Sequence, residues 1–121
     1  MLTAFYHEAQ VQVGDDGLRL VVNMRTIDAT EQLVGESMPT ILGQVLGADP
    51  SFALVGKVVW GLLREHHPEV SLDQAAGLMF GEPGKAVGLV IGDLFRRAFH
   101  IGEEAEKPAN PRKRRGASKP S

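Results

Sequence analysis

The 121-residue chain contains no cysteine, and this absence removes several kinds of chemistry at once. It excludes a disulfide scaffold, a thiolate metal site and a cysteine nucleophile, and it fits a reducing compartment. Aromatic residues are also few, with one Trp, one Tyr and five Phe. The core must therefore consist mainly of Leu, Val, Ile, Ala and Met. Because a chain of this size buries only about two-thirds of its unfolded surface, the remaining apolar surface allows a partner to bind or the chain to self-associate.

Long apolar runs are missing too. The two longest, residues 52–63 and 86–95, are interrupted by Lys57 and Asp93. Both fall far short of the roughly 20 apolar residues that cross a membrane. The first eight residues lack the basic start and the apolar stretch of a signal peptide. We therefore expect a cytoplasmic protein without a membrane partner.

Charge is distributed unevenly along the chain. Residues 1–106 carry seven Lys or Arg and fifteen Asp or Glu, a balance of −8, whereas residues 107–121 carry six basic residues and no acidic one. This composition predicts a disordered basic tail over residues 102–121. Nucleic acid is not the expected partner, because the acidic body would repel its backbone and no aromatic residue in the tail offers base stacking. The basic residues, which could instead contact an acidic protein surface or simply stay solvated, are Lys107, Arg112, Lys113, Arg114, Arg115 and Lys119.

The first part of the chain has the pattern of a β-hairpin. Apolar residues occupy alternate positions on both sides of residues 14–17, a Gly-Asp-Asp-Gly segment that predicts a turn. One face of the hairpin is therefore apolar, and a lone hairpin is marginal in water, so this face should dock on helices. Its residues are Ala9, Val11, Val13, Leu18, Leu20 and Val22.

After the hairpin the apolar period changes to that of helices. We expect helices at about residues 24–34, 37–46, 51–67, 71–80 and 85–100, with Pro68 ending the third and residues 82–84 separating the last two. Their inward stripes include Met24, His66, Met79 and Phe80. The fold class is therefore mainly α (α+β): an N-terminal β-hairpin packed on a small bundle of about five short helices. Residues 1–101 form this helical domain, and residues 102–121 form the tail.

Glycine recurs near the end of the domain at almost helical spacing. We interpret most of these glycines as loop ends or tolerated helix positions, each lowering local stability by about 1 kcal/mol relative to Ala. A contact face at Gly88 and Gly92 is the alternative. The full set is Gly77, Gly81, Gly84, Gly88 and Gly92.

The residue pattern offers no catalytic, cofactor-binding or metal-ligating residue. His66 and His67 are adjacent, so on a helix they point about 100° apart and are poorly placed to share one ion. Ser37 lacks the second glycine of a Gly-x-Ser-x-Gly nucleophile elbow and, like Ser51 and Ser71, suits a helix N-cap. The carboxylates are scattered over turns and polar faces. We therefore expect a binding protein rather than an enzyme.

Four segments in order give the chain a resemblance to a known family. They are DGLRL (residues 16–20), TEQLVGESM (30–38), VVWGLLR followed by His67-Pro68 (58–64), and LDQAAGLM (72–79). Over about residues 9–100 the chain resembles the tail assembly chaperones of long-tailed phages and gene transfer agents. The resemblance implies a non-catalytic protein of the bacterial host cytoplasm. Such a protein coats the tape measure protein, keeps its apolar helices soluble and helps recruit tail tube subunits.

Large apolar side chains anchor protein interfaces, although each one can equally belong to the core. On this ground the candidate protein-binding residues are Trp60, Met79, Phe80, Phe95 and Phe99. Two other functions remain open. Residues 72–99 could form a helix-turn-helix of a small nucleic-acid-associated regulator that uses the basic tail as a phosphate clamp. The chain could also be a structural virion component, such as a connector subunit.

Overall fold

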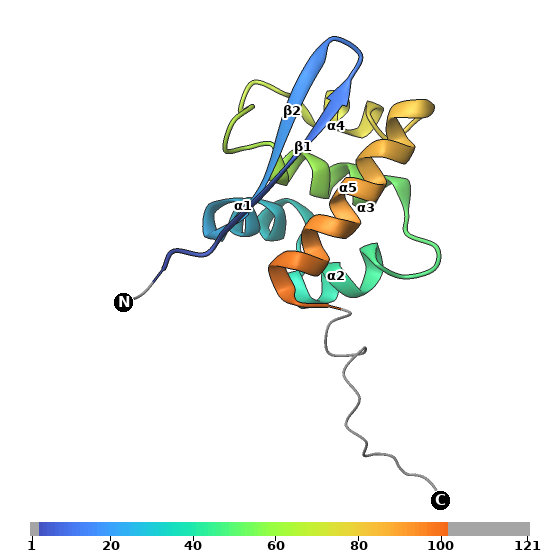
Figure 1. Cartoon of the computed structure of the whole chain (residues 1–121). Helices are drawn as coiled ribbons and strands as arrows, with labels where there is room; N and C mark the ends of the chain where they lie inside the picture. Colours follow the sequence, from blue (N-terminus) through green and yellow to red (C-terminus); the bar gives the residue numbers. More distant parts are fainter. Residues whose placement is uncertain (1–2, 102–121) are drawn as a thin grey trace, which may run out of the picture.

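The computed structural model describes residues 3–101, in which an antiparallel hairpin is followed by five helices (Figure 1). This arrangement confirms the predicted α+β class and the N-terminal hairpin. Residues 102–121, and with them all six basic candidates of the predicted tail, lie outside the described residues. The elements are β1 (Tyr6–Val13), β2 (Asp16–Asn23), α1 (Met24–Val34), α2 (Met38–Val45), α3 (Phe52–Leu62), α4 (Leu72–Gly77) and α5 (Glu82–Phe99).

The hairpin turn is tighter than the sequence pattern predicted. Val13 pairs with Asp16, so the turn contains only Gly14 and Asp15, and Gly17 already belongs to β2. Gly14 has a φ of 60°, the left-handed conformation that the first central position of a two-residue hairpin turn favours. Glycine at this position matches the turn to the twist of the strands. The turn therefore needs two residues rather than the four that the sequence pattern predicted.

A single core lies between the hairpin and the helices, with α5 packed along β1 (Figure 1). The inner face of the hairpin enters this core as predicted, through side chains such as Val11, Leu18 and Leu20. Helices α3 and α5 supply most of the remaining buried side chains. The largest of them are Leu62, Leu63, Ile91, Leu94 and Phe95.

The close helix contacts of the core are made by glycines that the sequence pattern did not single out. A Cβ at Gly61 of α3 would overlap the hydroxyl of Thr30 in α1, and one at Gly56 would lie 3.0 Å from Cα of Ala76 in α4. A Cβ at Gly88 would meet nothing within 4 Å. Helix α3 therefore approaches its neighbours through Gly56 and Gly61, whereas Gly88 faces open space.

Several predicted helix faces and ends are corrected. Met24 is exposed, because the Asn23–Thr26 capping box turns Thr26 inward instead. Helix α3 ends at Leu62, before His66 and Pro68. Helix α4 ends at Gly77, so Met79 and Phe80 lie in the following turn.

Helix α5 also differs from the prediction at its start. It begins at Glu82 rather than near Lys85, because Pro83 sits in its first turn, where a missing N–H removes no helical hydrogen bond. The segment that separates α4 from α5 is therefore residues 78–81, and Pro83 belongs to α5. The Ser71–Gln74 capping box at the start of α4 is confirmed.

Candidate protein-binding surface

The five predicted contact residues occupy three different environments. Phe95 is fully buried and packs against Phe99, with ring centroids 6.0 Å apart. Its assignment as an exposed contact is therefore corrected, since its side chain belongs to the core. Phe99 is half-buried and also contacts Phe5, 5.8 Å away between centroids. These two phenylalanines anchor the end of α5 to the start of β1.

Trp60 is half-buried beneath Arg64, whose guanidinium carbon lies 4.2 Å from the centre of the indole ring. The guanidinium also donates hydrogen bonds to four backbone carbonyls, those of Trp60, His67, Pro68 and Val70. Burial lowers the pKa of Arg64 from its ordinary value. Arg64 thus organises the loop between α3 and α4, and Trp60 forms part of that structural contact.

Of the two remaining candidates, Met79 lines an opening and Phe80 is the exposed residue that follows it. Met79 lines an apolar groove of about 270 Å³, which is bounded by the end of α2, the loop after it and α5. The apolar walls come from three helices and two connecting segments that are far apart in the sequence. They consist of Val45, Leu46, Pro50, Val55, Met79 and Ile91.

Three large apolar side chains that line the groove or lie close in sequence to its lining residues are exposed. Phe80, which directly follows Met79, is 58% exposed and packs on Phe52, which is 63% exposed, with ring centroids 5.3 Å apart. Leu89 of α5 lines the groove and is 77% exposed. Large side chains this exposed are unusual next to an apolar groove and mark a surface suited to a partner.

Sequence reasoning missed Phe52 and Leu89 as exposed residues. A signal for Leu89 was present, because it falls outside the apolar stripe of α5 that contains Val87, Val90 and Ile91. No comparable signal existed for Phe52, since its exposure depends on how the N-terminus of α3 meets Phe80 across the molecule.

One positively charged side chain lines the groove. Arg96 lines it, and its guanidinium folds back to within 3.0 Å of the position that a Cβ would take at Gly92. The neighbouring Arg97 is paired with Asp93, at 3.0 Å, and points elsewhere. Among residues 3–101, Arg96 has no acidic partner within ion-pair distance.

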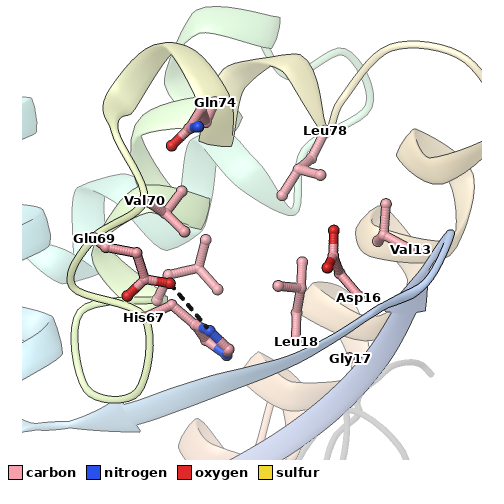
Figure 2. Close-up of a pocket in the computed structure, with 10 residues that line it drawn as sticks. Val13, Asp16, Gly17, Leu18, His67, Glu69, Val70, Gln74 and Leu78 are labelled. Carbon is pink, nitrogen blue, oxygen red and sulfur yellow. Dashed lines mark ion pairs between the residues drawn. The ribbon is translucent and has the colours of Figure 1, made fainter.

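A second opening lies between the turn end of the hairpin and the segment from α3 to α4 (Figure 2). It has a volume of about 340 Å³ and an apolar floor that includes Leu18, Leu63 and Leu78. Its rim carries Asp16 from the hairpin and Glu69 from the loop before α4. We call this opening, lined also by Val13, Val70 and Gln74, the acid-rimmed pocket.

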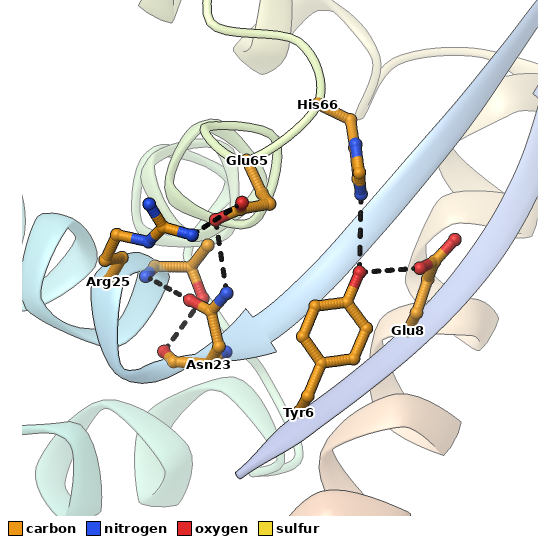
Figure 3. A network of polar contacts seen from close by, with 7 residues as sticks. Tyr6, Glu8, Asn23, Arg25, Glu65 and His66 are labelled. Carbon is orange, nitrogen blue, oxygen red and sulfur yellow. Dashed lines mark hydrogen bonds and ion pairs between the residues drawn. The ribbon is translucent and has the colours of Figure 1, made fainter. Parts of the chain in front are cut away.

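The hairpin is held to the α3–α4 loop by polar contacts on its outer side. His67 Nε2 accepts a hydrogen bond from the backbone N–H of Arg19 at 3.0 Å, and the Tyr6 hydroxyl lies 3.3 Å from His66 Nε2 (Figure 3). Glu8 bonds to both Tyr6 and Arg19, and the hydrogen bonds from Arg19 are the main reason that its pKa is lowered to about 2. Glu8 in turn raises the pKa of Tyr6.

The two adjacent histidines therefore face different partners, and each has a structural role. A third link joins Glu65 to Asn23 and Arg25 (Figure 3). Within residues 3–101 there is no cluster of three or more His, Asp or Glu side chains that could hold a metal ion. No helix in that part of the chain is long and apolar enough to cross a membrane.

The chain matches no protein-family model, and searches of curated proteins and of solved structures give no match.

Proposed function

We propose that this protein is a non-catalytic tail assembly chaperone that binds the tape measure protein and helps recruit tail tube subunits, as the sequence resemblance implies. The observation that supports the proposal is the apolar groove between α2 and α5, together with the exposed side chains of Leu89, Phe80 and Phe52. An amphipathic helix binds such a groove by inserting apolar side chains from every third or fourth position. The long partner's apolar helices are then shielded from water while the acidic body keeps the complex in solution.

The geometry of α5 favours a helix as the bound element. Gly88 and Gly92 both line the groove, and the open space at Gly88 lets a second backbone approach closely. Leu89 and Met79 line the groove as well, and Phe80, which follows Met79 in the sequence, packs on Phe52. Large apolar anchors of this kind typically cost about 2 kcal/mol or more of binding energy when they are lost from the centre of an interface.

The regulator alternative fits this surface less well. The segment between α4 and α5, residues 78–81, has the length of a helix-turn-helix turn. However, α5 would then be the recognition helix, and the middle of its outward face presents Gly88 and Leu89 between the exposed Lys85 and Asp93. Base recognition needs polar side chains at such central positions. The groove is a better match for an apolar polypeptide than for the edges of bases.

The test is co-expression of the full chain with the tape-measure-like protein encoded nearest to it, followed by pull-down and sedimentation. The wild type should convert the long partner into a soluble joint complex. Leu89→Asp should abolish this effect, because it places a charge in the groove at a position that is 77% exposed. Met24→Asp is the matched control, since Met24 is 66% exposed on α1, away from the groove, and should leave the complex intact.

Three outcomes would contradict the proposed function or the proposed binding site. An insoluble partner together with salt-dependent retardation of DNA by the isolated chain would favour the regulator. Recovery of the chain in finished particles would favour a connector subunit. Equal loss of the complex in Leu89→Asp and Met24→Asp would contradict the groove as the binding site. Survival of the complex after deletion of residues 107–121 would assign binding to the helical body.

A further inference from the structure

The acid-rimmed pocket has the chemistry of a site for a basic side chain. Its floor is apolar, and its rim carries the carboxylates of Asp16 and Glu69 with no Lys or Arg among the lining residues. Lysine and arginine side chains lay their aliphatic stems on apolar surface and keep the charged end at a polar rim. The pocket therefore complements a cation carried on an apolar stem.

The polar groups of the pocket leave room for such a ligand. Asp16 makes no hydrogen bond or ion pair through its side chain to any residue between 3 and 101. Glu69 lies 3.9 Å from Nδ1 of His67, whose Nε2 is occupied by the Arg19 N–H (Figure 2). Both carboxylates are exposed. Asp16 has no partner among these residues, whereas Glu69 has the weak contact with His67 and also interacts electrostatically with Arg64.

The chain itself contains a segment of matching chemistry. Residues 107–121 carry six basic residues and no acidic one, beside a body whose balance is −8. We propose that the basic run at residues 112–115 of this chain binds the acid-rimmed pocket of the same molecule.

The length of the chain after Ile101 determines which basic residues can reach the acid-rimmed pocket. Phe99 packs on Phe5, so α5 ends beside the start of β1. The pocket lies at the opposite end of the hairpin, because Val13 and Asp16 next to the hairpin turn line it. Figure 1 shows the hairpin turn and the end of α5 at opposite ends of the molecule. The strand between them spans about 24 Å, from seven steps of about 3.4 Å each. The backbone takes eleven steps from Ile101 to Arg112 and reaches at most about 36–40 Å, whereas the six steps to Lys107 reach only about 20 Å. Residues 112–115 can therefore enter the pocket without full extension of the chain, whereas Lys107 reaches it only if both the connecting backbone and its own side chain are fully extended.

The absence of cysteine gives a direct experiment on the full chain. Ser118→Cys creates a single attachment point for a nitroxide label, and paramagnetic broadening of backbone amide signals then maps where the segment lies. The broadening should concentrate on residues 16–18, 69–70 and 74, and it should vanish at high salt because exposed ion pairs are screened. Each carboxylate removed from the rim should weaken the docked state by up to about fivefold.

Matched variants separate specific docking from general attraction between opposite charges. Asp16→Asn with Glu69→Gln should abolish the local broadening, whereas Asp28→Asn with Glu36→Gln removes the same charge from exposed positions on and just after α1 and should leave it unchanged. Replacing residues 112–115 by glutamine should abolish it, and Lys107→Gln should not.

Broadening that spreads over all acidic surfaces, or that the two carboxylate pairs reduce equally, would overturn the proposal. So would broadening seen only when isotope-labelled and spin-labelled molecules are different chains, because the segment would then bind a second copy. Neither result bears on the groove between α2 and α5, which shares no lining residue with this pocket.

Discussion

Replacing Gly61 by alanine tests how α3 packs against α1. A Cβ at position 61 would overlap the Thr30 hydroxyl and would lie 2.9 Å from Cβ and 3.2 Å from Cα of Thr30. The last two atoms belong to the base of the side chain and to the backbone, so a rotamer change cannot relieve the overlap. The two helices must instead move apart within a close-packed core.

The structure also sets the expected magnitude. Overpacking of a core costs about 1–3 kcal/mol, and an overlap that involves backbone belongs at the upper end of this range. Alanine returns about 1 kcal/mol of helix propensity relative to glycine. The free energy of unfolding should therefore fall by about 2 kcal/mol, which corresponds to a drop in Tm of about 8–16 °C for a domain of this size.

The control is the same chemical change at a site with open space. Gly43 lies in α2, and a Cβ there would meet nothing within 4 Å. Gly43→Ala should accordingly raise the free energy of unfolding by up to about 1 kcal/mol. Urea denaturation followed by circular dichroism measures both variants, and adding Thr30→Ala to Gly61→Ala should recover part of the loss. Equal shifts of the same sign for Gly61→Ala and Gly43→Ala would refute the reasoning.

Three further predictions follow from the surface. Gly88→Leu should leave the unfolding midpoint in urea unchanged or raise it, yet it should fill the groove and abolish the joint complex in the sedimentation assay. Glu8 has a folded-state pKa of about 2 against an ordinary 4.5, so it stabilises the fold above pH 4.5 and loses this effect as the pH falls towards 2. Acid titrations of the wild type and Glu8→Gln should converge over that interval. Arg64→Lys removes donors from carbonyls in the α3–α4 loop and should lower the free energy of unfolding by about 1–3 kcal/mol, with a change in Trp60 fluorescence.

Features of the fold that depend on neighbours in sequence could be predicted. The hairpin follows from strict alternation around glycine, and the start of α4 follows from a serine and a glutamine three residues apart. The end of α1 at Gly35 is equally local, because glycine adopts the left-handed φ of 85° that closes the helix.

Features that depend on distant segments could not be predicted. Helix α3 ends just before Arg64, whose guanidinium donates hydrogen bonds to backbone carbonyls of residues up to six positions further along the chain. The groove needs the loop after α2, one residue of α3 and one face of α5 to meet, and no pattern within any of these segments indicates the others. The exposure of Leu89 is an exception, because its position outside the apolar stripe of α5 indicates it from the sequence alone.

The surface that carries the proposed function can be changed separately from the core. At Gly88 a side chain would enter open space, and Leu89 is already mostly exposed, so substitutions at either position leave the buried contacts of α5 in place. The same helix turns Val87, Leu94 and Phe95 into the core, where truncation unfolds the chain and so abolishes binding for a trivial reason. Loss of the joint complex is therefore informative only when the free energy of unfolding is unchanged. Helix α5 carries both exposed groove positions and buried core positions. Substitutions at the exposed positions therefore test binding, and substitutions at the buried positions show the effect of lost stability alone.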